Sequence, residues 1–161
     1  RYLIALGSNM RVPGVGGPRR VLAAALETLE CEGLVVKRIS PLLDNAPIGP
    51  SPRRYANAAA LVRTGLSPPD LLVLLQRMEA AFGRRRRGQR WRARPLDLDI
   101  ILWSGGAWVT PGLTIPHREF RSRSFVLEPA AQIAPRWRDP VTGLTLRHLH
   151  ARLTRPRPLP R

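Results

Sequence analysis

Residues 84–103 read RRRRGQRWRARPLDLDIILW, and the second part of this stretch decides the fold. Apolar residues alternate with Asp97 and Asp99 and then become continuous, which is the pattern of a strand with one buried face. Side chains two residues apart on a strand project from the same face. We therefore expect both carboxylates on one face, with Leu98 and Ile100 pointing into the core.

Further strand and helix signals lie on both sides of this strand. Apolar or β-branched runs bounded by turn residues predict strands, and apolar residues three and four apart predict helices. The expected strands are residues 2–6, 34–39, 55–64, 96–103 and 107–110, and the expected helices are residues 19–32, 68–82, 124–133 and 144–153. Gly105-Gly106 should join the last two strands as a hairpin. The Pro-rich residues 45–54 should form a loop.

The first two helices have defined core faces. In the first helix the residues expected in the core are Val21, Leu22, Ala25, Leu26 and Leu29. In the second helix they are Leu71, Leu72, Leu75, Met78 and Phe82. Ser67 is a good capping residue for the second helix because prolines and an acid follow it. Helices and strands alternate irregularly, which predicts an α+β domain with an antiparallel or mixed sheet.

Length and composition limit the class of protein. The 161 residues suit one domain, expected over residues 1–154, with a flexible tail over residues 155–161. No run approaches the roughly 20 apolar residues of a membrane span, and no signal-peptide pattern is present. We therefore expect a cytoplasmic protein with no membrane partner. Cys31 is the only cysteine, so no intramolecular disulfide can form, and we expect it in the core.

The net charge of +16 raises the possibility of a nucleic-acid partner. Every basic residue except Lys37 is arginine, however, and the charge is spread along the chain with one concentration at residues 84–94. We interpret most of this charge as general surface basicity.

The arginines beside Asp97 and Asp99 carry the chemistry. Two carboxylates on one strand face can hold Mg2+, which takes one or two protein carboxylates and leaves its other positions to water and phosphate. Guanidinium groups hold phosphate oxygens by bidentate hydrogen bonds, and Trp91 could stack on a planar ring. The alternative is that both acids merely pair with nearby arginines. The combination favours a nucleoside triphosphate as ligand.

Several motifs resemble one known family over nearly the whole chain. They are Ala5-Leu6-Gly7-Ser8-Asn9, Pro47-Ile48-Gly49-Pro50, Tyr55-x-Asn57-Ala58-Ala59, Arg90-Trp91-x-x-Arg94-x-Leu96-Asp97-Leu98-Asp99-Ile100, Thr114-x-Pro116-His117 and Arg123-x-Phe125. In this order and spacing they resemble the 6-hydroxymethyl-7,8-dihydropterin pyrophosphokinases. The resemblance implies a ferredoxin-like fold, and transfer of pyrophosphate from ATP to the pterin hydroxymethyl group with release of AMP, a step of folate biosynthesis.

The resemblance also implies a role for individual residues. The expected catalytic residues are Arg84, Arg94, Asp97 and Asp99, and the two aspartates would hold two Mg2+ ions. The ATP site would include Gln76, Glu79, Arg86, Arg90, Ile100, Thr114, His117 and Arg123. The pterin site would include Gly7, Asn45, Pro47, Ile48, Tyr55, Asn57, Trp91 and Phe125. The expected partners are these two small molecules, with no nucleic acid, and the expected state is a monomer.

Three positions depart from the family pattern. Asn45 replaces a usual threonine beside the pterin, Gly112 replaces a frequent arginine, and Arg118 replaces a frequent aromatic residue. Two other classes remain open from the residues alone. One is a basic nucleic-acid-binding module that uses residues 84–94, in which the paired acids would serve no purpose. The other is a metal-dependent nuclease, which would leave Asn57 and Phe125 unexplained.

Overall fold

The computed structural model describes residues 1–45, 55–83 and 95–160. The strands are β1 (Tyr2–Ser8), β2 (Val35–Ile39), β3 (Leu43–Asn45), β4 (Tyr55–Arg63), β5 (Asp97–Trp103), β6 (Trp108–Thr110) and β7 (Leu113–Ile115). The helices are α1 (Pro18–Cys31), α2 (Pro68–Ala81), the 3-10 helix η1 (Phe120–Ser122), α3 (Ser124–Ile133) and α4 (Leu146–Thr154). Every expected strand and helix is present, and β3, β7 and η1 are additional.

The main sheet has the strand order β2-β4-β1-β5, and β3 also pairs with β4. All of these pairs are antiparallel. Since β1 and β2 both run opposite to β4, they are parallel to each other, with α1 between them in sequence. For the same reason β4 and β5 are parallel on either side of β1, and α2 connects them. These interleaved βαβ units form a ferredoxin-like sheet, which confirms the expected α+β class.

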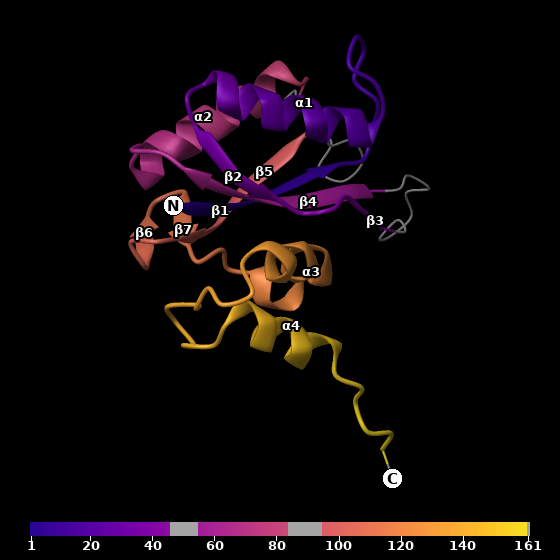
Figure 1. The fold of residues 1–161 in the computed structure, drawn as a ribbon, viewed down its shortest axis with the longest axis vertical. Helices are drawn as coiled ribbons and strands as arrows, with labels where there is room; N and C mark the ends of the chain where they lie inside the picture. The colour runs from indigo at the N-terminus through magenta and orange to yellow at the C-terminus, as the bar shows by residue number, and fades with distance from the viewer. Residues whose placement is uncertain (46–54, 84–94, 161) are drawn as a thin grey trace.

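Helices cover both faces of the sheet. Helices α1 and α2 lie on one face, and α3 lies on the other with α4 below it (Figure 1). Each face has its own buried cluster of apolar residues. Leu98 and Ile100 belong to the cluster under α1 and α2, whereas Ile101 belongs to the cluster above α3. The expectation that Leu98 and Ile100 point into the core is therefore confirmed. Asp97 and Asp99 project from the opposite face of the sheet.

The helix faces were predicted well for α1 and partly for α2. All five residues expected in the core of α1 are buried, and Gly33 follows the helix at φ +91°. In α2, Leu71, Leu75 and Met78 are buried as expected. Leu72 and Phe82 are only partly buried, while Leu74 and Glu79 are buried instead. The buried face of α2 is thus rotated away from Leu72, which frees this side chain to line a cleft described below.

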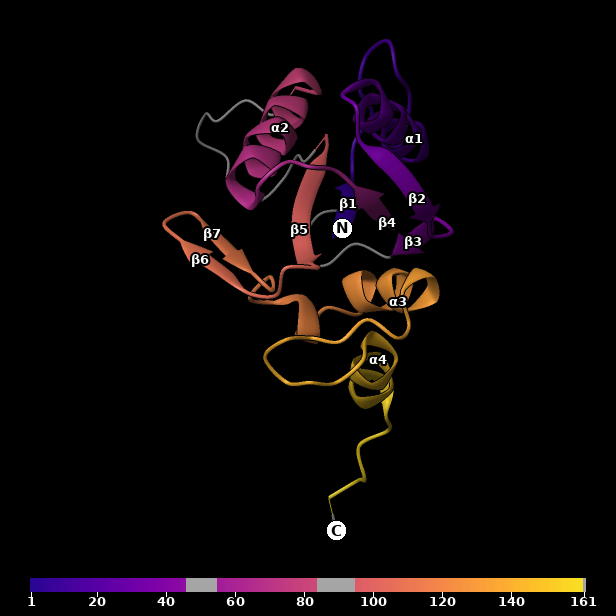
Figure 2. The ribbon, with the colours of Figure 1, turned by 60° about the vertical axis from the view of Figure 1, so that its left-hand side comes forward.

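The predicted hairpin between β5 and β6 is wrong. Gly106 does turn back on Trp103, whose carbonyl accepts its N–H at 3.0 Å. The following strand β6 pairs with β7 instead, from Trp108 opposite Ile115 to Thr110 opposite Leu113. This small hairpin stands apart from the main sheet, below α2 (Figure 2). The Trp103 ring covers Gly105, where a Cβ atom would lie 2.3 Å from it, so a larger residue at this turn would displace the ring.

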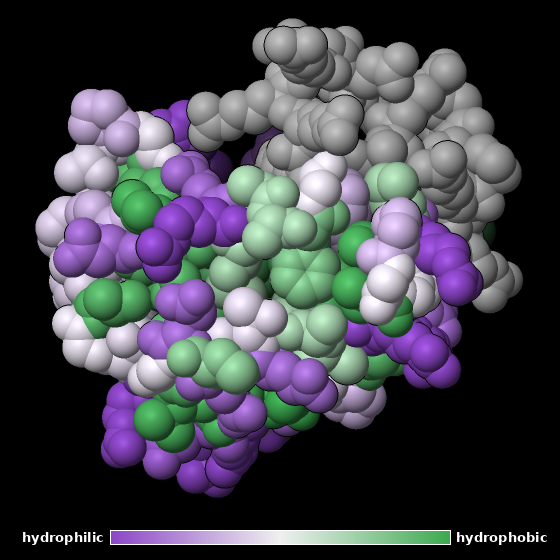
Figure 3. Space-filling model, turned by 90° about the horizontal axis from the view of Figure 1, so that it is seen from above, coloured by the Kyte–Doolittle hydropathy of each residue, from purple (hydrophilic) through white to green (hydrophobic). Residues whose placement is uncertain are grey.

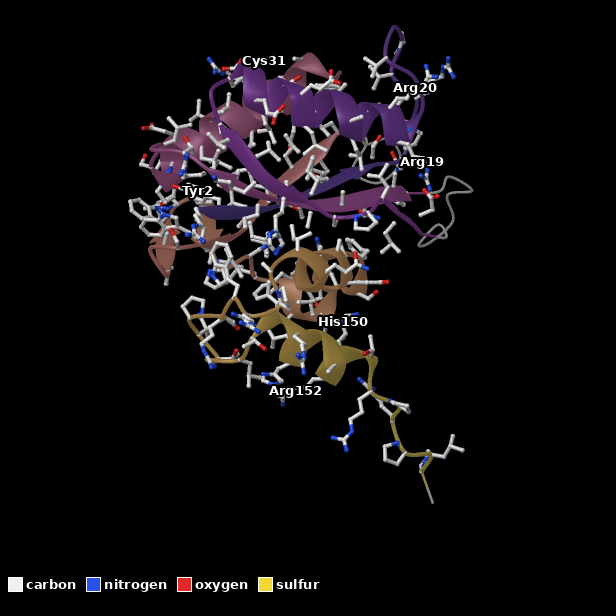
Figure 4. The ribbon with its side chains drawn as sticks, viewed as in Figure 1. Tyr2, Arg19, Arg20, Cys31, His150 and Arg152 are labelled. Carbon is white, nitrogen blue, oxygen red and sulfur yellow. The ribbon has the colours of Figure 1, made fainter. Side chains whose placement is uncertain are left out.

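Two smaller expectations also need correction. Asn45 was expected in a loop but ends β3 opposite Tyr55. Cys31 was expected in the core, yet it is exposed at the end of α1 opposite to Arg19 (Figure 4). Cys31 is two residues past Leu29, the last buried residue of α1, and therefore lies about 200° round the helix from it, which explains its exposure.

From the side of α1 and α2, hydrophilic residues surround smaller hydrophobic areas (Figure 3). Within the described ranges, no helix has the length and apolar character that crossing a bilayer requires. Residues 155–160 are exposed and form neither helix nor strand.

Candidate functional site

The candidate site begins with a row of three residues across neighbouring strands. Gly7 of β1 lies opposite Asn57 of β4 on one side and opposite Asp97 of β5 on the other. A Cβ atom on Gly7 would lie 3.1 Å from the side-chain oxygen of Asn57, so the missing side chain leaves room for this amide. Adjacent strands are about 4.8 Å apart. An amide and a carboxylate therefore flank a gap of about two strand spacings.

A second row lies directly behind the first. Ala5 is opposite Ala59 on β4 and opposite Asp99 on β5. The two rows share a sheet face because they are two residues apart on each strand. This face therefore presents two carboxylates at the β5 side, one amide at the β4 side, and small residues between them. Asp97 and Asp99 are half-buried, and Asn57 is buried.

His117 extends the site from Asp99. Its backbone N–H donates to the carbonyl oxygen of Ile101 at 3.0 Å, which fixes the residue against β5. Its Nδ1 accepts the backbone N–H of Glu119 at 3.2 Å. In the neutral ring the proton must then be on Nε2, which lies 4.0 Å from a carboxylate oxygen of Asp99. His117 therefore presents a donor beside the carboxylate pair.

A cleft of about 550 Å³ opens beside this histidine, between α2, β5 and the β6–β7 hairpin. Its lining is Leu72, Leu98, Asp99, Ile100, Thr110, Pro111, Gly112, Leu113, Thr114, His117, Arg118 and Glu119. Three residues expected at an ATP site, Ile100, Thr114 and His117, thus lie around one cavity together with Asp99. Apolar side chains from α2 and β5 form one wall, and polar groups gather at the other, as is common in ligand clefts.

Glu79 and Gln76 lie on α2 in different environments. Glu79 is 5% exposed, and its carboxylate accepts the backbone N–H of Leu98 at 2.9 Å. Leu98 lies between Asp97 and Asp99 on β5, an edge strand of the sheet. This bond therefore satisfies a backbone donor that no neighbouring strand among the described residues pairs with. Gln76 is exposed, and neither residue is part of the cleft lining.

Arg123 and Phe125 lie at the start of α3. The guanidinium of Arg123 forms an ion pair with Glu119 four residues earlier, and its Cζ atom lies 5.8 Å from the centre of the Phe125 ring. Phe125 packs in part against the cluster under the sheet. Tyr55 is half-buried at the first position of β4. Arg123 and Glu119 are both exposed enough to exchange partners.

Other expected site residues lie outside the described residues. They are Arg84, Arg86, Arg90, Trp91, Arg94, Pro47 and Ile48. Conversely, the structure brings Leu72 and Glu119 to the cleft, although neither was expected to bind a ligand, and Gly112 and Arg118, two of the positions that depart from the family pattern, line it as well. The spacing of Glu119 and Arg123 could have revealed their pairing, since residues four apart face each other on a helical turn.

Asp97 and Asp99 can be judged as magnesium ligands by their chemistry. Across residues 1–45, 55–83 and 95–160, no three or more His, Cys, Asp or Glu side chains gather as a metal cage. Two carboxylates on one face suit Mg2+, which is commonly held by one or two carboxylates and by the phosphates of its substrate. They do not suit a metal that needs a closed protein cage. The residues therefore fit magnesium delivered with a polyphosphate.

Comparison with known proteins agrees with the motifs. The profile of the 7,8-dihydro-6-hydroxymethylpterin-pyrophosphokinase (HPPK) family matches residues 3–135. The chain is 37% identical over 146 residues to 2-amino-4-hydroxy-6-hydroxymethyldihydropteridine pyrophosphokinase of Synechocystis sp., covering 89% of this chain and 71% of that one. The enzyme of the same name from Pseudomonas aeruginosa is 39% identical over 142 residues, covering 87% and 84%.

The relative of that name from Haemophilus influenzae is 39% identical over 133 residues, which is 81% of this chain and 79% of the relative. These matches confirm the resemblance seen in the sequence. The chain belongs to the 7,8-dihydro-6-hydroxymethylpterin-pyrophosphokinase family.

Proposed function

We infer that this chain transfers pyrophosphate from ATP to the hydroxymethyl group of 6-hydroxymethyl-7,8-dihydropterin, giving AMP and the pterin diphosphate. The observation that carries this inference is the juxtaposition of Asn57, Gly7 and Asp97 across three strands. It places a group that can read a heterocycle about two strand spacings from a carboxylate that can serve a triphosphate. The cleft beside Asp99 adds room for a nucleotide.

The pterin would lie on the sheet face at Gly7. The amide of Asn57 offers a donor and an acceptor, which matches the edge of a pterin ring. Phe125 and Tyr55 would contact its flat faces, together with Trp91. Asn45, Pro47 and Ile48 would complete this side, because β3 brings Asn45 beside the first residue of β4.

ATP would occupy the cleft between α2, β5 and the β6–β7 hairpin. Ile100 of β5 and Thr114 of β7 both line this space and would hold the adenosine. His117 would donate from Nε2 to a phosphate oxygen, since its Nδ1 is already an acceptor. Arg123 would exchange Glu119 for a phosphate. Glu79 would act indirectly, by holding the backbone of β5 at Leu98, and Gln76 would lie at the outer end.

The arginines of residues 84–94 would neutralise the triphosphate. Arg84 and Arg94 would hold the transferred group, and Arg86 and Arg90 would bind the remaining phosphate oxygens by paired hydrogen bonds. Phosphoryl-type transfer depends on positioning and on charge stabilisation more than on covalent chemistry of the protein. The arginines of residues 84–94 would meet this need.

Asp97 and Asp99 would hold two Mg2+ ions. When bound, these ions would screen the triphosphate and clamp the oxygens around the reacting phosphorus. The two aspartates contribute the fixed geometry, because both project from one rigid strand. Asn57 and the aromatic residues would direct the pterin hydroxyl at the β-phosphorus, in line with the departing AMP. Closure of the site would exclude water and so prevent hydrolysis.

The chain would act as a monomer in the cytoplasm, on these two small molecules and without nucleic acid. The test is to incubate it with ATP, Mg2+ and 6-hydroxymethyl-7,8-dihydropterin and to separate the nucleotides. AMP should form only with the pterin present. Asp97→Asn should abolish most of it, while Glu27→Gln, which changes an exposed acid on α1, should not. Formation of ADP, or no turnover together with tight binding of RNA or DNA, would overturn the proposal.

A further inference from the structure

One buried carboxylate lies outside the site described so far. The Asp139 side chain is 0% exposed. Arg121 donates to it twice, from Nε to Oδ2 at 2.6 Å and from Nη2 to Oδ1 at 2.8 Å. The Thr142 hydroxyl donates to Oδ2 at 2.8 Å, and the Val141 N–H donates to Oδ1 at 3.0 Å. Burial alone would raise the pKa of Asp139, but these donors outweigh it and the pKa is lowered.

Arg121 lies at the centre of η1, shortly after His117 and Glu119, which line the nucleotide cleft. His117 precedes it and Arg123 and Phe125 follow it in the chain. The preceding residue, Phe120, is fully buried under the sheet, and the Arg121 guanidinium lies 4.7 Å from the centre of its ring. A 3-10 helix of three residues has little stability of its own. Its orientation must therefore come from contacts such as the one with Asp139.

Asp139 is itself held rigidly. Its N–H donates to the carbonyl oxygen of Leu144 at 2.9 Å, and its carbonyl oxygen accepts the N–H of Gly143 at 2.8 Å. These bonds close the turn between α3 and α4, which ends where Leu146 donates to the Trp137 carbonyl oxygen. The carboxylate therefore projects from a fixed turn. It also lies beyond residues 3–135, the part matched by the family profile.

The ion pair between Arg121 and Asp139 can hold η1 in place while Arg123 changes its partner. Arg123 is now paired with Glu119, and this pair also holds the two ends of η1 together. A phosphate that takes Arg123 removes this contact. A bidentate arginine–carboxylate pair fixes both distance and plane, so Arg121 and Asp139 can keep η1 in place during the exchange.

We propose that Asp139 is a positioning residue for nucleotide binding: through Arg121 it fixes η1 and so holds His117 in the wall of the cleft and Arg123 beside it, next to Glu119. This inference rests on the proposed function, because it takes the cleft as the ATP site. It assigns a role in the reaction to the turn between α3 and α4, which touches no substrate in the proposed arrangement.

The test compares three variants with the wild type. Asp139→Asn keeps the shape of the side chain and removes its charge. We expect the KM for ATP to rise about tenfold, below the roughly hundredfold cost of a 1 Å misplacement, while kcat at saturating ATP changes little. Arg121→Lys keeps one charged contact and should give an intermediate KM. Leu26→Ala is the control, since it weakens the core on the opposite face of the sheet.

Hydrogen exchange of the backbone amides of residues 117–127 supplies a second readout. Asp139→Asn should lose protection there, and Leu26→Ala should not. An unchanged KM in folded Asp139→Asn, or a KM that rises equally in Leu26→Ala, would overturn the inference. If Asp139→Asn does not fold, Arg121→Lys takes its place: its KM for ATP and its hydrogen exchange at residues 117–127 are compared with those of Leu26→Ala in the same way.

A wild-type protein that makes no AMP would instead overturn the proposed function. The Kd of ATP then decides the inference separately. A rise in Asp139→Asn but not in Leu26→Ala supports the positioning role, and equal values in all proteins, or no ATP binding at all, refute it.

Discussion

Replacement of Gly7 by alanine tests the geometry of the site with one added methyl group. The new Cβ atom would lie 3.1 Å from the Asn57 side-chain oxygen and 3.9 Å from the Ala56 carbonyl oxygen. The first contact is too short by a few tenths of an ångström, and the Asn57 amide is the group that can move. Gly7 is not among the glycines with positive φ, so alanine fits the backbone without strain.

Gly7→Ala should weaken pterin binding while it leaves the stability of the fold nearly unchanged. Alanine restricts the unfolded chain, which adds roughly 0.4–1 kcal/mol of stability and offsets the close contact. The free energy of unfolding should therefore change by less than about 1 kcal/mol. Displacement of the amide should cost one hydrogen bond to the pterin, about 0.5–1.5 kcal/mol. This loss corresponds to a roughly two- to tenfold higher Kd for the pterin.

Calorimetric titration with the pterin and a non-hydrolysable ATP analogue measures this Kd, and urea unfolding measures the stability. Gly65→Ala is the matched control, because no atom lies within 4 Å of its added Cβ and its φ is not positive. Both variants should bind the ATP analogue normally. A pterin Kd unchanged in Gly7→Ala would refute the placement of the pterin against Asn57.

Three further predictions concern other parts of the molecule. Asp99→Asn should lower kcat at least about a hundredfold with little effect on pterin Kd, and near-normal kcat in steady-state assays would contradict a magnesium ligand there. Ser67→Ala should lower the urea-unfolding free energy by about 0.5–1 kcal/mol without changing either KM, because the serine caps α2 at 3.4 Å; altered kinetics would contradict a purely local cap. Because the pKa of Asp139 is lowered from 3.8, its stabilisation is complete above that pH and is lost as the pH falls further below it. The gap in urea midpoint between wild type and Asp139→Asn should then be wider at pH 6 than at pH 3, and a constant gap would contradict this titration.

The sequence predicted the long elements of the fold because each has enough residues to establish a period. The five core positions of α1 are an example, as is the alternation around Asp97. Strands β3 and β7 have three residues each, which is too few for a pattern, and β6, equally short, was expected only because the Gly105-Gly106 turn precedes it. The wrong partner of β6 has another cause. Gly105-Gly106 marks a turn, but a turn does not say which strand will pair with the next one.

Residue spacing predicted only those features of the site that lie within a single strand. The shared face of Asp97 and Asp99 follows from their spacing. The row of Asn57, Gly7 and Asp97 depends on the register between three strands that are far apart in sequence, and no local pattern encodes it. Only the resemblance to a family assigned Gly7 and Asn57 to the site. The buried pair of Asp139 and Arg121 had no local signal either, because the two residues are 18 apart, one in η1 and the other in the turn between α3 and α4.

In the proposed reaction the β- and γ-phosphates of ATP move together to the pterin. The direct measurement uses ATP labelled with ³²P at the β-position, with Mg2+ and 6-hydroxymethyl-7,8-dihydropterin. We predict that the label appears in the pterin product, one equivalent for each unlabelled AMP. Label that remains in ADP, or that is released as inorganic phosphate or pyrophosphate, would contradict the claim.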